Sequence, residues 1–163
     1  MTDSLYTSPH GAEARIKALG LALPPPRPPI GSFAPAVSHG GLCFLSGQGP
    51  VRPDGFRYVG CVGEGRKGGE ARDHARLTTL NLLSALRGEI RSLDRVRRIV
   101  KLFGMVNATS EFAAQDEVIA GAVELLIDIF GPQIGRPAGT AVGMGSLPNQ
   151  ITVEIEVVVA IDE

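Results

Sequence analysis

Two short segments of the sequence carry side chains suited to small-molecule chemistry. Glu154 lies in an apolar stretch, residues 153–157, so a strand there would leave its carboxylate partly buried and able to hold a water molecule or shuttle a proton. Ser46-Gly47-Gln48 follows an apolar run; its glycine permits a close backbone approach, and its serine hydroxyl can bind a ligand carbonyl or carboxylate. Both segments also have plainer interpretations, Glu154 as a solvent-facing strand residue and Ser46-Gly47-Gln48 as a turn that ends a strand.

The composition argues against several other kinds of site. The three histidines, His10, His39 and His74, are scattered without metal-ligand spacing, and none is placed to activate a serine nucleophile. Residues 60–69 are rich in glycine but contain neither GxGxxG nor GKS or GKT, so they do not indicate a phosphate loop. Sixteen basic and seventeen acidic residues give a net charge of −1, which is not the basic surface that nucleic acids require. We therefore expect no metal, no cofactor and no nucleic-acid partner.

The length and cysteine content fit a single intracellular domain. At 163 residues, of which 44% are apolar, the chain can fill one core. Cys43 and Cys61 form no CxxC pair, no apolar run approaches the ~18 residues of a membrane span, and residues 1–11 lack the basic start and apolar centre of a signal peptide. We expect a cytoplasmic protein with reduced cysteines and no membrane contact.

The elements expected to position Ser46 lie in the first half of the chain. In chain order they are a loose end (1–11), a short helix (12–19), an extended proline-rich strap (24–29), two strands (33–37 and 41–46) and a turn at Pro53-Asp54-Gly55. The strap is extended because proline fixes φ and lacks an amide donor. A stiff connection between helix and strand is favoured over an SH3-type ligand as its role.

The elements expected to position Glu154 lie in the second half. In chain order they are a long helix (70–90), a buried strand (99–106), a second helix (111–130) capped by Ser110 and ended by Gly131-Pro132, and two strands (139–144 and 151–161). Along the last strand, apolar residues alternate with Thr152, Glu154 and Glu156, so one face would be buried and the other open. This order favours an α+β fold with a mixed sheet and two helices on one face. The open face of such a sheet predicts an oligomer.

Three groups of residues resemble, in order along the chain, the motifs of the Rid superfamily, also called YjgF or endoribonuclease L-PSP. They are Ile30-Gly31-Ser32-Phe33 with Phe44-Leu45-Ser46-Gly47-Gln48, then residues 77–106, then residues 136–156 with "RPAGTAVG", "LP" and "VEIE". The resemblance runs over residues 12–161, and the early helix and strap are similar to the longer, chorismate-mutase-like subgroup. By this resemblance the chain has two parts. Residues 1–29 form a flexible end, a short helix and the strap, and residues 30–163 form a Rid-like domain.

The resemblance implies a chorismate-mutase-like α+β fold and a homotrimer whose sheets face a central barrel. It also implies a small-molecule cleft between each pair of subunits. Well-known members of the superfamily hydrolyse reactive enamines and imines to 2-keto acids and ammonia. Matching the motifs position by position assigns Glu154 as the catalytic, water-holding residue. The same matching assigns substrate binding to Phe33, Ser46, Gly47, Gln48, Gly139 and Thr140.

The chain departs from the superfamily at several of these positions. The arginine that grips the substrate carboxylate falls on Gly139, and the tyrosine falls on Phe33, which keeps the ring but loses the hydroxyl. The family asparagine falls near Ala120 and the cysteine on Ala141. A buried substrate carboxylate without its arginine would cost ~2–5 kcal/mol. Arg136 lies three residues before Gly139, so on a strand it would point to the opposite face.

Three functions stay open on these residues. The first is a divergent deaminase-type hydrolase that acts on a substrate without the usual carboxylate. The second is a non-catalytic trimer that binds a small metabolite in a more apolar cleft. The third, a ribonuclease or translation inhibitor, is disfavoured by the neutral charge, and chorismate mutase activity would rest on fold analogy alone.

Overall fold

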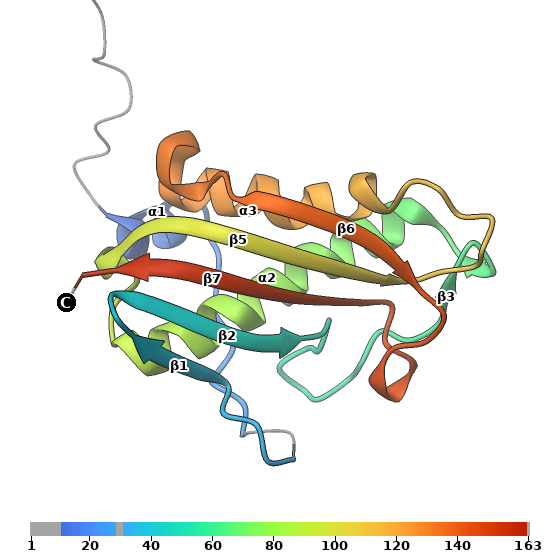
Figure 1. The fold of residues 1–163 in the computed structure, drawn as a ribbon, viewed down its shortest axis with the longest axis horizontal. Helices are drawn as coiled ribbons and strands as arrows, with labels where there is room; N and C mark the ends of the chain where they lie inside the picture. The colour runs from blue at the N-terminus through green and yellow to red at the C-terminus, as the bar shows by residue number, and fades with distance from the viewer. Residues whose placement is uncertain (1–10, 29–30, 163) are drawn as a thin grey trace, which may run out of the picture.

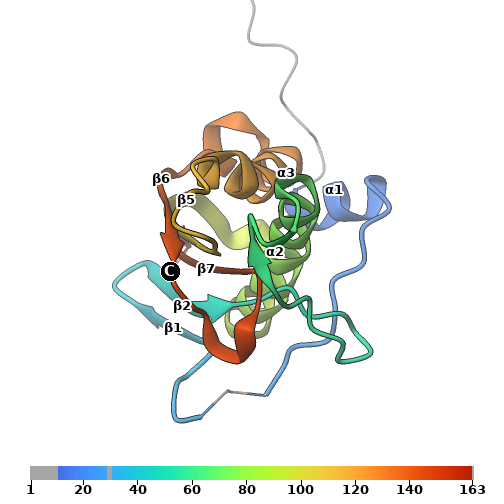
Figure 2. The same cartoon turned by 90° about the vertical axis from the view of Figure 1, so that its right-hand side faces the viewer.

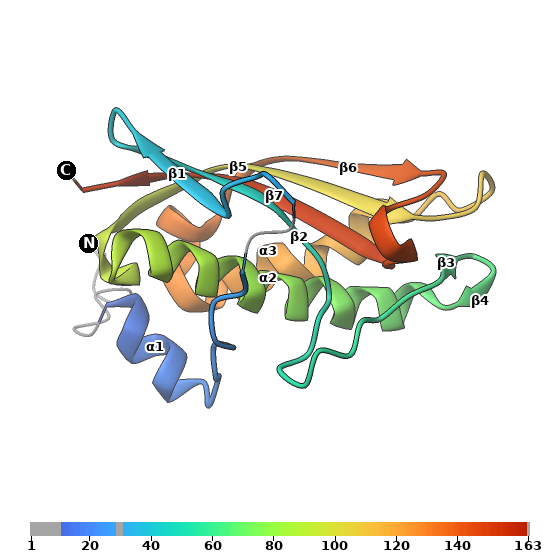
Figure 3. The same ribbon diagram turned by 90° about the horizontal axis from the view of Figure 1, so that it is seen from below.

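A computed structural model describes residues 11–28 and 31–162, in which one sheet is covered by helices on one face (Figures 1 and 3). The sheet has five strands in the order β1 (Ala36–His39), β2 (Leu42–Gln48), β7 (Val153–Ile161), β5 (Val96–Asn107) and β6 (Ala138–Met144). The expectation of a loose end over residues 1–10, and the motif residue Ile30, lie outside the described residues. The α+β class with a mixed sheet is confirmed.

The direction of each strand follows from its connection. The neighbours β1, β2, β7 and β5 pair antiparallel, whereas β6 runs parallel to β5. A parallel pair needs a crossover, and α3 (Gln115–Gly135) supplies it. A second, two-stranded sheet joins β3 (Cys61–Val62) to β4 (Gly65–Arg66) within the glycine-rich segment that was expected to be a loop.

The core lies between the sheet and two long helices, α2 (Gly68–Ile90) and α3. Figure 2 shows the sheet curving around these helices, with α1 (Ala12–Ala18) on their outer side. The alternation expected along the last strand is confirmed over β7, where the apolar positions are buried and the intervening ones are not. Buried side chains that meet there include Leu83, Leu86, Val118, Leu125, Ile155 and Val159.

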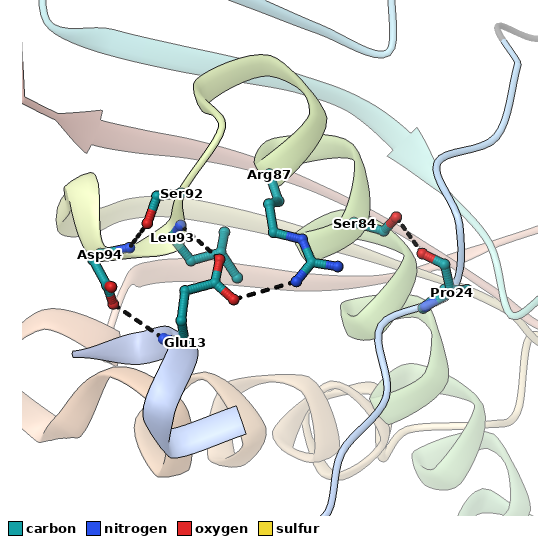
Figure 4. A network of polar contacts seen from close by, with 7 residues as sticks. All are labelled: Glu13, Pro24, Ser84, Arg87, Ser92, Leu93 and Asp94. Atoms are coloured by element: carbon teal, nitrogen blue, oxygen red, sulfur yellow. Dashed lines mark hydrogen bonds and ion pairs between the residues drawn. The ribbon is translucent and has the colours of Figure 1, made fainter. Parts of the chain in front are cut away.

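The first helix and the strap are attached to the rest of the domain by polar contacts. The two carboxylate oxygens of Glu13 accept hydrogen bonds from the backbone amide of Leu93 at 3.1 Å and from Arg87 at 3.2 Å (Figure 4). Farther along, the Ser84 hydroxyl on α2 donates to the carbonyl oxygen of Pro24 at 2.6 Å. The described part of the strap, residues 24–28, therefore runs beside α2 on its way to β1 (Figure 3).

Two local expectations about α3 are wrong. The helix begins at Gln115, not after Ser110, because the Ser110 hydroxyl donates to the Glu111 carboxylate at 2.7 Å instead of capping the helix. Gly131, with φ 79°, does break the helix, but a further helical segment continues to Gly135. Pro132 is tolerated because it opens that new segment, where its missing amide costs nothing.

The length and composition of α3 also differ from expectation. By these two criteria alone α3 could cross a membrane, although no segment of that kind was expected. Inside the domain, 44% of its most apolar stretch is buried. Its buried residues include Val118, Leu125 and Ile129, which belong to the core. The apolar character of α3 is therefore that of a helix packed against a sheet and a second helix.

Thr152 is not on the open face where the alternation of the last strand places it. The strand begins at Val153, and Thr152 is fully buried, with its hydroxyl 2.9 Å from Nδ1 of His74. His74 in turn stacks on Tyr58, with 4.2 Å between the ring centroids. Through Tyr58, the buried pair of His74 and Thr152 packs the segment after β2 against α2.

A close contact between α2 and α3 predicts a helix-packing defect. A Cβ atom added to Gly121 would lie 2.5 Å from the backbone carbonyl oxygen of Arg72, which cannot move away without shifting α2. We expect Gly121→Ala to lower the free energy of unfolding by about 1–3 kcal/mol, as overpacking does, measured by urea denaturation. Gly69→Ala, on α2 with open space around it, is the control and should be neutral or slightly stabilising; equal stability of the two variants would contradict this packing.

Candidate functional site

A cavity of about 320 Å³ lies between the strap, the end of β2, α2 and the short 3₁₀ turn η2 (Pro148–Gln150). This volume is at the lower end of the range for small-molecule sites. Five of the residues assigned from the sequence line it together: Phe33, Ser46, Gly47, Gln48 and Glu154. The other two, Gly139 and Thr140, are exposed on β6, which is separated from β2 by β7 and β5.

An irregularity in β2 shapes the cavity floor. Leu45 pairs with Val157 and Gln48 pairs with Ile155, so three steps along β2 match two steps along β7. Such a bulge adds one residue to a strand and re-aims its side chains. It brings the Ser46-Gly47 backbone against the β7 side chain of Glu154.

Gly47 and Glu154 are in direct contact. A Cβ atom at position 47 would lie 2.1 Å from the Oε1 atom of Glu154, so the carboxylate occupies the space that a larger residue would take. Burial, and secondarily the negative charge of Glu156, raises the pKa of the Glu154 carboxyl. No ion pair among the described residues involves Glu154. The site therefore holds a half-buried carboxylate whose charge is not compensated by a basic partner.

The hydroxyl of Ser46 is used within the chain. It donates to the carbonyl oxygen of Ala34 at 2.6 Å, and the Ser46 amide donates to the carbonyl oxygen of Pro35 at 3.0 Å. These bonds attach the segment with Phe33 to β2, which places the phenyl ring at the cavity even though 75% of Phe33 is exposed. Ser46 thus positions the cavity wall, and its oxygen keeps lone pairs for a ligand.

Sequence reasoning missed five polar residues that line the cavity: Arg27, Arg57, Asn81, Asn149 and Glu156. Asn81 could have been found as the one amide on the buried stripe of α2, where it is 4% exposed. Arg27 is the single charge within the proline-rich strap, but no sequence pattern says that the strap passes the cavity. Among the described residues, no cluster of three or more His, Cys, Asp or Glu is placed to hold a metal ion.

Comparison with known proteins identifies the family. Residues 13–148 match the family described as "YjgF/chorismate_mutase-like, putative endoribonuclease". The chain belongs to the YjgF, or Rid, family. The family match covers the strap and strands β1, β2, β5 and β6, and it ends before β7.

Several known proteins resemble the chain over nearly its whole length. Protein TCP17 of Trypanosoma cruzi is 33% identical over 149 residues, which cover 91% of this chain and 93% of TCP17. The crystal structure of Atu1372 from Agrobacterium tumefaciens is 36% identical with a TM-score of 0.85, covering 93% of this chain and 92% of the other. A crystal structure from Shewanella oneidensis, described as a "putative endoribonuclease", is 26% identical with a TM-score of 0.88. The alignment covers 93% of this chain and 100% of the other.

Packing within the chain does not demand the glycine found at the family's arginine position. A Cβ atom at Gly139 would meet only the carbonyl oxygen of Leu102, at 3.7 Å, which is ordinary van der Waals contact. The Gly139 backbone also lies outside the left-handed region that favours glycine. Within the chain, a larger side chain could therefore be accommodated at position 139.

The raised pKa of Glu154 predicts a pH-dependent gain in stability for Glu154→Gln. Because folding favours the protonated carboxyl, Glu154 lowers wild-type stability progressively as pH rises from the ordinary glutamate pKa to the raised one. The neutral glutamine removes this penalty. We expect its melting temperature to exceed that of wild type by about 1–3 °C at pH 8, with the difference vanishing below about pH 4.

The control for this measurement is Glu64→Gln, which makes the same change on an exposed loop residue. It should show no pH-dependent difference from wild type in the same calorimetric series. A Glu154→Gln variant less stable than wild type at pH 8 would mean that the charged carboxylate is stabilised by contacts, contrary to its uncompensated burial.

Proposed function

We propose that the protein is a Rid-type hydrolase that converts a small imine, or the enamine that tautomerises to it, into a carbonyl compound and ammonia. The observation that supports this most is the Glu154 carboxylate, half-buried against Gly47 in a cavity of small-molecule size. A raised pKa suits a carboxylate to exchange protons near neutral pH. Membership of the YjgF family adds support, because imine hydrolysis is the activity that the resemblance implies.

The reaction needs one water molecule and one group that moves protons. Glu154 holds the water and takes one of its protons as the oxygen attacks the imine carbon. Glu154 passes that proton to the nitrogen, which gives a carbinolamine. The hydroxyl of the carbinolamine then loses the second proton of the water to the nitrogen by way of Glu154, the C–N bond breaks, and ammonia leaves; the carbonyl oxygen that remains comes from the water. Glu154 returns to its starting state, so no oxidant, reductant or cofactor is consumed.

The activity is tested by ammonia release from 2-aminoacrylate generated in the assay. Wild type should release ammonia faster than buffer alone. Glu154→Gln should lower the rate enhancement at least about 100-fold, the usual size of a general acid–base contribution. Gly47→Ala should also lower it, because the new methyl group displaces the carboxylate while leaving it in the chain.

Glu64→Gln serves as the control in the same assay and should retain wild-type activity, since Glu64 is exposed and does not line the cavity. Wild-type protein that gives no acceleration over buffer, for this enamine and for a panel of related imines, would contradict the hydrolase. A ligand that raises the melting temperature without being hydrolysed would then favour a non-catalytic binding protein.

The open face of the sheet supports the further proposal that copies of the chain associate. The family resemblance sets the proposed number at three, and the cytoplasm is the proposed location. Phe44, Val158 and Lys101 are cross-strand neighbours on that face, as are Glu156 and Phe103. They surround a shallow hollow of about 170 Å³ whose surface is mainly apolar. An apolar sheet face of this kind is usually covered by another surface. In the trimer implied by the family, β6 of one copy would bring Gly139 and Thr140 toward the cavity of its neighbour.

A charged substitution on the sheet face tests the trimer. Phe44→Glu should convert the protein from a species of three chains to a single chain in light scattering coupled to size exclusion, because three buried carboxylates would be desolvated together. Leu19→Glu, at a position of matched exposure on the helical side, 44% against 45% for Phe44, should leave the mass unchanged. A wild-type mass of one chain would rule the trimer out.

A further inference from the structure

The chain bends where it enters β7, between two residues of the cavity. Ile151 and Glu154 both line the cavity, whereas Thr152 and Val153 between them are fully buried. Neighbouring residues of a regular strand point to opposite faces, so two consecutive buried residues mark a bend. Because a shift of one residue in register turns every side chain of a strand to the other face, this bend decides which way Glu154 points.

The turn η2, just before the bend, needs support from its neighbours. Asn149 and Gln150 have φ values of 54° and 56°, in the left-handed region that residues other than glycine rarely adopt. Two such residues in succession persist only where the surrounding structure holds them. Part of that support comes from the segment after β2, where the Gly60 amide donates to the carbonyl oxygen of Gln150 at 2.9 Å. Since Pro148 and Asn149 line the cavity, the support also fixes a cavity wall.

Thr152 is bonded through all three of its polar groups, each to a different element. Its amide donates to the carbonyl oxygen of Tyr58, after β2, at 3.2 Å, and its carbonyl oxygen accepts from the amide of Asn107, on β5, at 2.9 Å. Its hydroxyl lies 2.9 Å from Nδ1 of His74, on α2. Any residue could make the two backbone bonds. The third requires a hydroxyl at position 152 and a hydrogen-bonding side chain at position 74.

His74 makes this bond as an uncharged ring. Burial, and secondarily the positive charge of Arg66 on β4, lowers the pKa of His74, although the carboxylates of Glu70 and Asp73 on α2 act in the opposite direction. The imidazole is therefore neutral at pH 7. His74 does not line the cavity, so it has no direct access to a substrate there.

We propose that His74 is a positioning residue for Glu154 and acts through its hydrogen bond to Thr152. The bond fixes the bend at the start of β7, and the bend sets the register in which Glu154 lies against Gly47. The same bond holds the end of η2 and with it the cavity wall. This inference rests on the proposed function, which gives Glu154 its role in the reaction.

An NMR titration of the Glu154 carboxyl carbon tests the positioning without requiring turnover. Thr152→Val removes the hydroxyl and keeps the shape of the side chain. The pKa of Glu154 should then fall toward that of an ordinary glutamate, because a displaced carboxylate gains water. Thr152→Ser restores the hydroxyl and should restore the wild-type titration.

The ammonia-release assay adds a kinetic measurement. Thr152→Val should lower kcat by about 10- to 100-fold, the cost of a small misplacement of a catalytic group. Thr152→Ser should recover most of this loss. His74→Phe keeps a ring against Tyr58 but cannot bond to Thr152, so it should behave as Thr152→Val does. His74→Asn keeps a polar atom near the Nδ1 position and should retain more of the rate than His74→Phe.

Thr79→Val is the matched control. Thr79 is also buried, and its hydroxyl also makes a hydrogen bond of 2.9 Å, but to the carbonyl oxygen of Ala75 within α2. Its loss should lower the melting temperature about as much as Thr152→Val does. It should leave both kcat and the titration of Glu154 as in wild type, because this bond does not reach β7.

The inference is overturned if Thr152→Val titrates at Glu154 as wild type does, or if Thr79→Val changes that titration as much. If Thr152→Val does not fold, His74→Phe decides by the same criterion, since it removes the other half of the bond. These results would leave the hydrolase proposal standing. Conversely, an inactive wild type with the expected titrations would contradict hydrolysis and keep the positioning role of His74.

Discussion

The contact between Gly47 and Glu154 is the constraint on which the site depends. The carboxylate can lie on the cavity floor only because position 47 has no side chain, and the bulge in β2 brings the two residues together. The same burial that makes room for the carboxylate raises its pKa. The bulge in the β2–β7 pairing therefore determines where the Glu154 carboxylate lies, how far it is buried and, through that burial, its raised pKa.

The strap is the second determinant of the site, and its stiffness matters. Prolines restrict the backbone before folding, so less conformational entropy is lost when the strap is laid along α2. The Ser84–Pro24 hydrogen bond attaches it to α2, and the Arg27–Arg52 bond attaches it to the loop after β2. These two bonds fix the course of the strap past the cavity.

The order of elements and the alternation of β7 could be predicted because each depends on local periodicity, and the family motifs located five residues of the cavity. The start of α3 and the place of Thr152 could not, because a side-chain bond at Ser110 and a buried contact with His74 override the local pattern. Arg27 and Asn81 were missed for a related reason. These two residues line the cavity only because the strap, β2 and α2 come together in the fold, and no local sequence pattern indicates that contact.

If three copies associate as proposed, β6 of a neighbouring copy lies near the cavity, and the charge at position 139 becomes part of the electrostatics of the site. An arginine at position 139 would then add a further guanidinium to a cavity that already holds Arg27 and Arg57, and like charges in a confined site of low dielectric repel strongly. Since packing leaves room for a side chain at 139, the glycine is not a structural necessity. Its small size keeps this position uncharged, whereas the cavity already carries two arginines and two glutamates from one chain.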